Sequence, residues 1–154
     1  MEDREIVEHL KTIPLFRDLT DERGELELYH ITPIVQVKSY NVGDWVFNQG
    51  QPSTGLYLVL EGKLRLTRVD RDGITRHLKD MGPGAVLGET GLLVGDVHDA
   101  TAEALMPTRL LYIDRDEFAE ILEKRPRLRH NLNMSEDVAR RRSVPRLDWM
   151  RDDE

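Results

Sequence analysis

Cysteine is absent from the 154-residue sequence. The absence excludes a thiolate nucleophile, a redox-active cysteine pair and every metal centre with cysteine ligands, iron–sulfur clusters included. Long hydrophobic runs are also missing, since no stretch approaches the roughly 18 apolar residues of a membrane-spanning helix. Residues 1–11 are charged and lack the apolar centre of a signal peptide. We therefore expect a cytoplasmic protein.

Aromatic residues are scarce, at 6% of the chain, while 39% of the residues are hydrophobic. At this length a folded chain buries about 68–70% of the surface that it exposes when unfolded, so one core is sufficient without disulfides or a structural metal. The composition therefore indicates one domain of ordinary size, and we expect it to require no cofactor.

The charge is mainly acidic, with 22 Lys and Arg residues against 29 Asp and Glu residues. Residues 124–151 carry a net charge of +6, which leaves −13 for the rest of the chain. Because DNA binding depends on basic side chains that neutralise phosphates, the acidic part should repel DNA. About a dozen residues follow Arg142, too few for a helix-turn-helix module, so we expect no DNA binding by this chain alone.

Glycine divides the middle of the sequence into short segments, because ten of the eleven glycines lie between residues 43 and 95. The intervening segments alternate in polarity or are rich in β-formers, which predicts strands. Asp72-Gly73 is typical of a tight hairpin turn. The predicted strands are residues 34–40, 45–47, 56–60, 63–69, 75–81, 101–104 and 109–113. Short strands at regular spacing favour an all-β sandwich or barrel, of which the jelly roll is one form.

Helices are predicted before the strands. Ile6, Leu10 and Ile13 follow the spacing of a buried helical stripe, and Pro14 is expected to end that helix. Thr20 is expected to cap a second, weaker helix.

Helices are also predicted after the strands. Asp114 followed by Glu117 resembles a capping box, and Pro126 is expected to start a further helix. That last helix has a narrow seam of small or apolar residues, which suits packing on a partner helix, so we expect a homodimer through it. The seam consists of Leu128, Leu132, Ser135 and Ala139.

Four glycine-anchored motifs occur in order along the chain. They are Gly43-Asp44-x-Val46-Phe47-x-x-Gly50, Leu56-Tyr57-x-Val59-Leu60-x-Gly62, Gly82-Pro83-Gly84 and Gly88-Glu89-x-x-Leu92-Leu93. Together they resemble the cyclic-nucleotide-binding domain family, which includes catabolite activator and Fnr-type regulators, regulatory subunits of cyclic-AMP-dependent kinase and nucleotide-gated channels. The resemblance covers roughly residues 13–142. It implies a mainly β fold with flanking helices, built as a double-stranded β-helix or jelly roll.

The resemblance also divides the chain. Residues 1–142 are expected to form the domain, with a helical part over 1–31, a β-roll over 32–114 and C-terminal helices over 114–142. Residues 143–154 are expected to be a tail or linker that carries both basic and acidic side chains. We expect a regulatory or sensor domain, not an enzyme, with further sequence or a further domain joined to it.

The family's phosphate-binding cassette aligns with residues 87–101 without a gap. The resemblance implies that Gly88 lets the backbone approach the ligand, that Glu89 accepts a hydrogen bond from the ribose 2′-hydroxyl, and that backbone N–H groups of the next turn face the phosphate. The candidate ligand is cyclic AMP or cyclic GMP. The candidate ligand-binding residues are Gly88, Glu89, Thr90, Gly91, His98, Asp99, Ala100 and Thr101.

The cassette departs from the family pattern where charge matters. His98 stands at the position of the arginine that neutralises the cyclic phosphate, and Asp99 stands at the position of a small residue. Val97 replaces a proline, and Gly91 replaces the usual alanine. Loss of a charge-assisted bond costs roughly 1.5–3 kcal/mol, or about one to two decades in affinity. We therefore expect weak or altered cyclic-nucleotide binding. A protonated His98, favoured by Asp99, would give pH-dependent binding of a nucleotide or another small anion.

Other interpretations remain open at this point. Glu89 can instead cap the short helix that follows it, His98 can be an ordinary loop histidine, and Asp99 can pair with His98 or a nearby arginine. In that case the chain is a degenerate interaction or dimerisation module without a ligand. A cupin-type metalloenzyme shares the jelly-roll architecture, but the five histidines contain no His-x-His pair and no third ligand at metal spacing.

Overall fold

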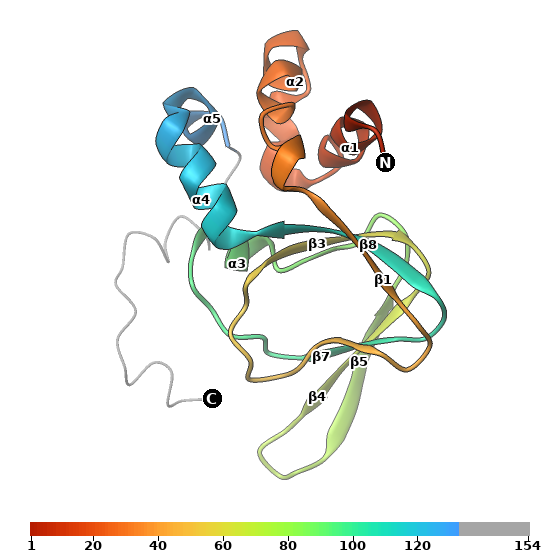
Figure 1. Ribbon diagram of the computed structural model, residues 1–154. Helices are drawn as coiled ribbons and strands as arrows, with labels where there is room; N and C mark the ends of the chain where they lie inside the picture. Colours follow the sequence, from red (N-terminus) through yellow and green to blue (C-terminus); the bar gives the residue numbers. More distant parts are fainter. Residues whose placement is uncertain (133–154) are drawn as a thin grey trace.

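The computed structural model describes residues 1–132, and these form a β-roll with helices gathered on one side of it (Figure 1). Four short helices precede the strands: α1 (Asp3–Leu10), the 3₁₀-helix η1 (Pro14–Leu19), α2 (Glu22–Leu28) and the 3₁₀-helix η2 (Thr32–Ile34). The first helix ends at Leu10, before the predicted Ile13. Ile13 is nevertheless 1% exposed and belongs to the same core as Leu10.

The cap predicted for α2 is wrong by one residue. Asp21 is the N-cap, and its carboxylate accepts a hydrogen bond from the Gly24 N–H at 2.7 Å. Thr20 instead donates its hydroxyl to the Arg17 carbonyl. Gly24 has a low intrinsic helix propensity, but a residue with a Cβ would not fit there, because the Cβ would overlap the backbone of Leu19. Glycine therefore allows η1 and α2 to pack closely.

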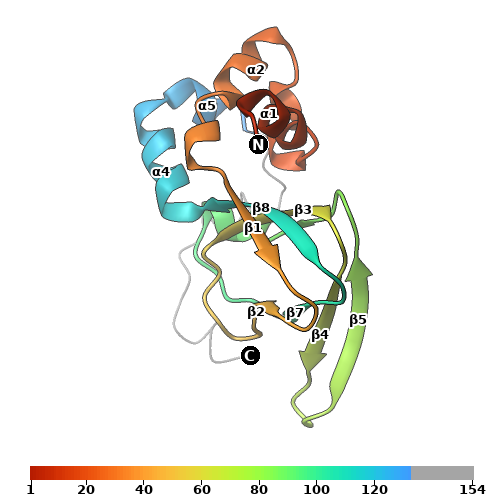
Figure 2. The same ribbon diagram turned by 45° about the vertical axis from the view of Figure 1, so that its right-hand side comes forward.

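The predicted mainly β fold is confirmed. Eight strands form two four-stranded antiparallel sheets, in the orders β1-β8-β3-β6 and β2-β7-β4-β5. Their bounds are β1 Gln36–Tyr40, β2 Trp45–Phe47, β3 Gly55–Glu61, β4 Leu64–Val69, β5 Thr75–Met81, β6 Val86–Leu87, β7 Thr101–Ala104 and β8 Thr108–Asp114. The hairpin of β4 and β5 projects beyond the roll on the side away from the helices (Figures 1 and 2).

Most of the predicted strands are confirmed within a residue at each end, and two predictions need correction. The first strand begins at Gln36, because residues 32–34 form η2. The two-residue strand β6 was not predicted, and it is the strand that leads into the cassette.

Two hydrophobic cores lie on opposite faces of the sheet that contains β3 and β8. Leu56 and Leu58 of β3 join the helix-side core, which also contains the buried residues of α1, η1, α2 and α4. Tyr57 and Val59 alternate with them and point into the roll-interior core. β8 divides its side chains between the two cores in the same way. Both strands are therefore covered on both faces, which explains why they are almost continuously apolar.

Two short helices follow the roll. α4 (Arg115–Lys124) has Asp114 as its N-cap, and the Asp114 carboxylate accepts the Glu117 N–H at 3.1 Å, as predicted. Pro126 is the first residue of α5 (Pro126–His130), also as predicted. Across residues 1–132, no helix combines the length and the apolar character needed to cross a membrane.

Candidate functional site

The predicted cassette connects the two sheets, because it runs from β6 in one sheet to β7 in the other. β6 ends at Leu87, Gly88 follows, α3 (Glu89–Leu93) forms a short helix, and a loop leads to β7. Gly88 adopts the left-handed conformation, with φ of 77°, and a Cβ there would lie 2.5 Å from the Gly55 carbonyl oxygen. Glycine is required for both reasons, since it allows positive φ and close backbone approach. The cassette is thus fixed against β3 at Gly88.

Gly91 lies in the middle of α3, directly against Ser53. A Cβ at Gly91 would overlap the Ser53 hydroxyl. Ser53 is 3% exposed, and its Oγ has no hydrogen-bond partner among the described residues. Its backbone is held on both sides, by the Asp96 carbonyl through its N–H and by the Arg115 guanidinium through its carbonyl oxygen, at 2.7 and 2.8 Å. The alanine usual at this cassette position therefore does not fit beside this serine.

Glu89 contacts the N-terminal helices. Its Oε2 atom accepts a hydrogen bond from the Leu15 N–H at 3.1 Å, although the two residues are 74 positions apart. The interpretation that Glu89 caps α3 is wrong, because Gly88 is the N-cap and no side chain caps that helix. Glu89 instead caps η1, in which Leu15 is the second residue. Burial raises the pKa of Glu89, and the Leu15 N–H and the charge of Arg17 oppose that rise.

His98 stacks on Phe47 of β2. The ring centroids are 3.7 Å apart and the planes are inclined by 8°. The His98 backbone also fixes the loop after β2, because it accepts the Gly50 N–H and donates to the Gln51 carbonyl. Burial lowers the pKa of His98, and the neighbouring Asp99 only partly opposes this effect. Asp99 favours protonation of the imidazole, as expected, but desolvation outweighs the adjacent carboxylate, so the net shift of the pKa is downward.

The remaining cassette residues have mixed surroundings. Asp99 is exposed and makes no ion pair within residues 1–132, so the expected pairing with His98 or an arginine is not seen there. Ala100 is 4% exposed. The Thr101 hydroxyl accepts the Gln49 N–H at 2.9 Å, and Thr90 is half-buried. Ala100 and Thr101 thus hold the end of the cassette against the roll.

A row of aromatic rings, not predicted from the sequence, continues from His98 through the roll. The ring centroids of Phe47 and Tyr57 are 5.6 Å apart, and those of Tyr57 and Tyr112 are 4.9 Å apart. The Lys38 ammonium lies 4.0 Å from the centroid of the Tyr112 ring. The Tyr112 hydroxyl is 2.6 Å from the Thr54 hydroxyl, and burial is the main cause that raises its pKa to about 12. The sequence predicts β1, β2, β3 and β8 as strands, but it does not show which of their side chains contact one another.

Two of the four residues of the predicted dimer seam pack inside the chain itself. Leu128 is fully buried and Leu132 is 8% exposed, and both belong to the helix-side core of the chain itself. These two residues are therefore not available for contact with a partner chain. Ser135 and Ala139 lie outside the described residues.

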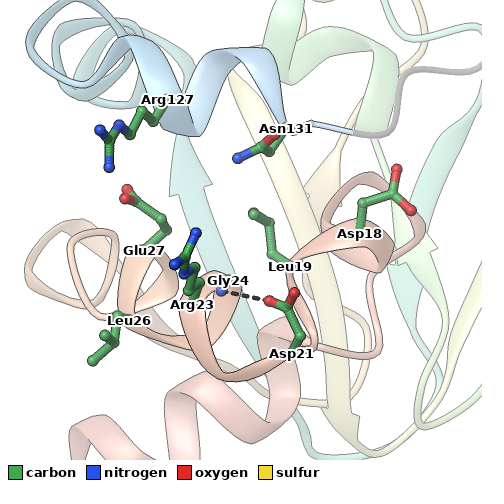
Figure 3. Close-up of a pocket in the computed structure, with 9 residues that line it drawn as sticks. All are labelled: Asp18, Leu19, Asp21, Arg23, Gly24, Leu26, Glu27, Arg127 and Asn131. Carbon is green, nitrogen blue, oxygen red and sulfur yellow. Dashed lines mark hydrogen bonds between the residues drawn. The ribbon is translucent and has the colours of Figure 1, made fainter.

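A pocket of about 740 Å³ lies between α2 and α5, away from the cassette (Figure 3). Its lining residues are Asp18, Leu19, Asp21, Arg23, Gly24, Leu26, Glu27, Arg127 and Asn131. The Glu27 carboxylate and the Arg127 guanidinium point toward one another across it (Figure 3). None of the predicted ligand-binding residues lines this pocket. Among residues 1–132, no three His, Cys, Asp or Glu side chains are grouped as metal ligands.

The two antiparallel sheets, with a glycine-anchored turn, a short helix and a loop between β6 and β7, define a domain of the jelly-roll class. The sequence model of the family described as "Cyclic nucleotide-binding domain" matches residues 37–125, which include this whole segment. The chain belongs to that family.

Similar proteins agree with this assignment. The chain is 36% identical over 123 residues to the cyclic AMP receptor protein of Thermus thermophilus; the match covers 80% of this chain and 55% of that receptor. The N-terminal domain of a transcriptional regulator from Streptomyces coelicolor superposes with a TM-score of 0.72 at 30% identity, over 88% of this chain and 91% of that one. A cAMP-bound PfPKA-R structure gives a TM-score of 0.67 at 27% identity, over 78% and 41% of the two chains. The chain therefore spans little more than half of the curated receptor.

Proposed function

We propose that this chain is a cytoplasmic regulatory domain, without catalysis of its own, that binds cyclic AMP or cyclic GMP at residues 88–101. The observation that supports this most directly is the cassette, which has the family's length and is fixed by the left-handed Gly88 at the crossing of the two sheets. The names of the Thermus receptor and of the cAMP-bound PfPKA-R structure support a cyclic nucleotide as the ligand class. No cofactor is needed for such a role.

The proposed affinity at neutral pH is low. The cyclic phosphate is an anion, and the residue at the arginine position is an imidazole whose pKa is lowered by burial. A neutral imidazole donates at most one hydrogen bond and no charge, whereas a guanidinium forms charge-assisted and bidentate bonds. Acidic pH is therefore expected to strengthen binding, as His98 becomes protonated.

Isothermal titration calorimetry of the 154-residue chain with cyclic AMP and cyclic GMP at pH 7.5 and 6.0 tests the proposal, with 5′-AMP as the non-cyclic control. We expect saturable binding of at least one cyclic nucleotide, tighter at pH 6.0. Amide chemical-shift changes should include residues 86–101 and should be absent from the tip of the β4–β5 hairpin. If neither nucleotide binds at millimolar concentration at either pH, the proposal is wrong.

The alternative is a domain that has lost its ligand and serves as an interaction module. One observation favours it: Tyr57 and Tyr112 are each 5% exposed, so aromatic side chains already fill the roll interior. The absence of nucleotide binding together with a dimeric mass by light scattering would support this alternative.

We also propose that residues 1–142 act as one unit, that residues 143–154 are a tail or linker, and that the unit forms a homodimer without binding DNA by itself. Because Leu128 and Leu132 are used by the core, the proposed contact depends on Ser135 and Ala139. Light scattering of Ala139→Glu beside the parent chain tests this. A halved mass is expected, and an unchanged dimer or a monomeric parent would exclude this seam.

A further inference from the structure

Glu89 joins two parts of the molecule that are far apart in sequence, α3 of the cassette and the start of η1. The first N–H groups of a helix lack partners within the helix and need other acceptors. In η1 the first residue, Pro14, has no N–H, and the Phe16 N–H already bonds to the Ile13 carbonyl. Leu15 therefore carries the donor at this end that needs an acceptor from elsewhere, and Glu89 provides it.

The bond lies on the helix side of the sheet. Leu15 belongs to the helix-side core, together with Leu92 of α3. His98 faces the other way, since it stacks on Phe47 of the roll-interior core. The two cassette residues expected to touch a nucleotide thus point to opposite sides of the β1-β8-β3-β6 sheet. While the Glu89 Oε2 atom accepts the Leu15 N–H, the carboxylate is held on the helix side of the sheet, away from a ligand near His98.

We propose that Glu89 is a switch residue that is shared between η1 and the ligand, so that cyclic-nucleotide binding takes the carboxylate from Leu15 and uncaps η1. This inference rests on the proposed function, because it assigns to the same site the way in which it signals. In the ligand-free chain this hydrogen bond holds the cassette to the N-terminal helices. In the bound chain the hydrogen bond is broken, and η1 and the helices packed on it are free to shift against the roll.

Linkage fixes the direction of the effect. If the ligand and the Leu15 N–H compete for one carboxylate, any change that removes the Leu15 donor must strengthen ligand binding, and ligand must weaken the bond to Leu15 to the same degree. A hydrogen bond to a charged group is worth enough to change an equilibrium about tenfold or more. We therefore expect about tenfold tighter nucleotide binding once the Leu15 donor is removed.

The donor can be removed without changing any side chain. Replacement of Leu15 by the corresponding α-hydroxy acid turns the Pro14–Leu15 amide into an ester, which deletes the N–H and keeps the buried leucine side chain. Denaturant unfolding of the parent, the ester, Glu89→Ala and the combined variant first verifies the bond. The ester should lower stability in the parent background and have no further effect in the Glu89→Ala background.

Calorimetry of the parent and the ester at pH 6.0 then tests the switch. About tenfold tighter cyclic-nucleotide binding by the ester, with loss of hydrogen-exchange protection at the Leu15 amide of the parent on saturation, supports it. Equal or weaker binding by the ester, while the parent binds, overturns the switch and leaves the proposed function intact. Absence of binding by both proteins overturns the proposed function, and the switch fails with it.

Discussion

His98→Arg should convert the cassette from a weak to a strong anion site. In the parent, His98 is stacked on Phe47 and its pKa is lowered by burial, so it is mostly neutral at pH 7.5. Arginine is charged at every accessible pH and its planar guanidinium can keep the stack on Phe47. A charge-assisted bond contributes roughly 1.5–3 kcal/mol, which corresponds to about 10- to 150-fold in affinity. Because the stack uses the face of the guanidinium and leaves its in-plane N–H groups free to donate, we expect an increase within this range.

Calorimetry with cyclic AMP and cyclic GMP across pH 6.0–7.5 measures the effect. The parent's affinity should rise as the pH falls, by up to about tenfold per pH unit above the pKa of His98, because the bound anion favours the protonated imidazole. The arginine variant should show no such dependence. Asp99→Asn is the matched control, and since Asp99 is exposed it should change affinity less than about threefold. The reasoning is refuted if His98→Arg binds no tighter than the parent at pH 7.5.

Three further predictions concern the packing of the same region. Gly91→Ala should lower the free energy of unfolding by about 1–3 kcal/mol, because its Cβ overlaps Ser53, and Ser53→Gly should restore most of that loss; additive losses in a denaturant double-mutant cycle would contradict the overlap. Glu89→Gln keeps an acceptor for the Leu15 N–H; since burial raises the pKa of Glu89, the parent should lose stability as the pH rises through that raised pKa, and a pH series of unfolding curves should show no such loss in the variant. Gly24→Ala should reduce the melting temperature despite the better helix propensity of alanine, because the new Cβ meets the Leu19 backbone, and a stabilised variant would disprove that contact.

The sequence was sufficient for the roll because its signals are local. Glycines at turns and alternating polarity predicted β2, β5 and β7 to the residue and most other strands within one residue at each end. The strand β6 was missed because two residues are too short to show any alternation. The sequence does not separate Thr20 from Asp21 as the α2 cap, because both are good N-cap residues. Only the backbone geometry identifies Asp21.

The cassette was located from the sequence, but its contacts were not. The partner of Glu89 is the N–H of Leu15, a backbone group that carries no side-chain signal and lies 74 residues away. The departure at Gly91 has its physical reason in Ser53, which lies outside all four sequence motifs. The sequence shows that Asp99 favours protonation of His98, but it does not show the burial beside the Phe47 ring that lowers the His98 pKa.

The cassette has side chains in both hydrophobic cores, Leu87 in the roll-interior core and Leu92 in the helix-side core, and this determines where a ligand can act. Leu92 packs with the helices, while His98 packs with Phe47 inside the roll. Packed cores resist gradual deformation, so movement of His98 by a ligand shifts the segment that carries Glu89 and Leu92 as well. The response should therefore appear at η1 and α4, which contact α3 and its core. The β4–β5 hairpin, which projects away from the helices, should be unaffected by this route.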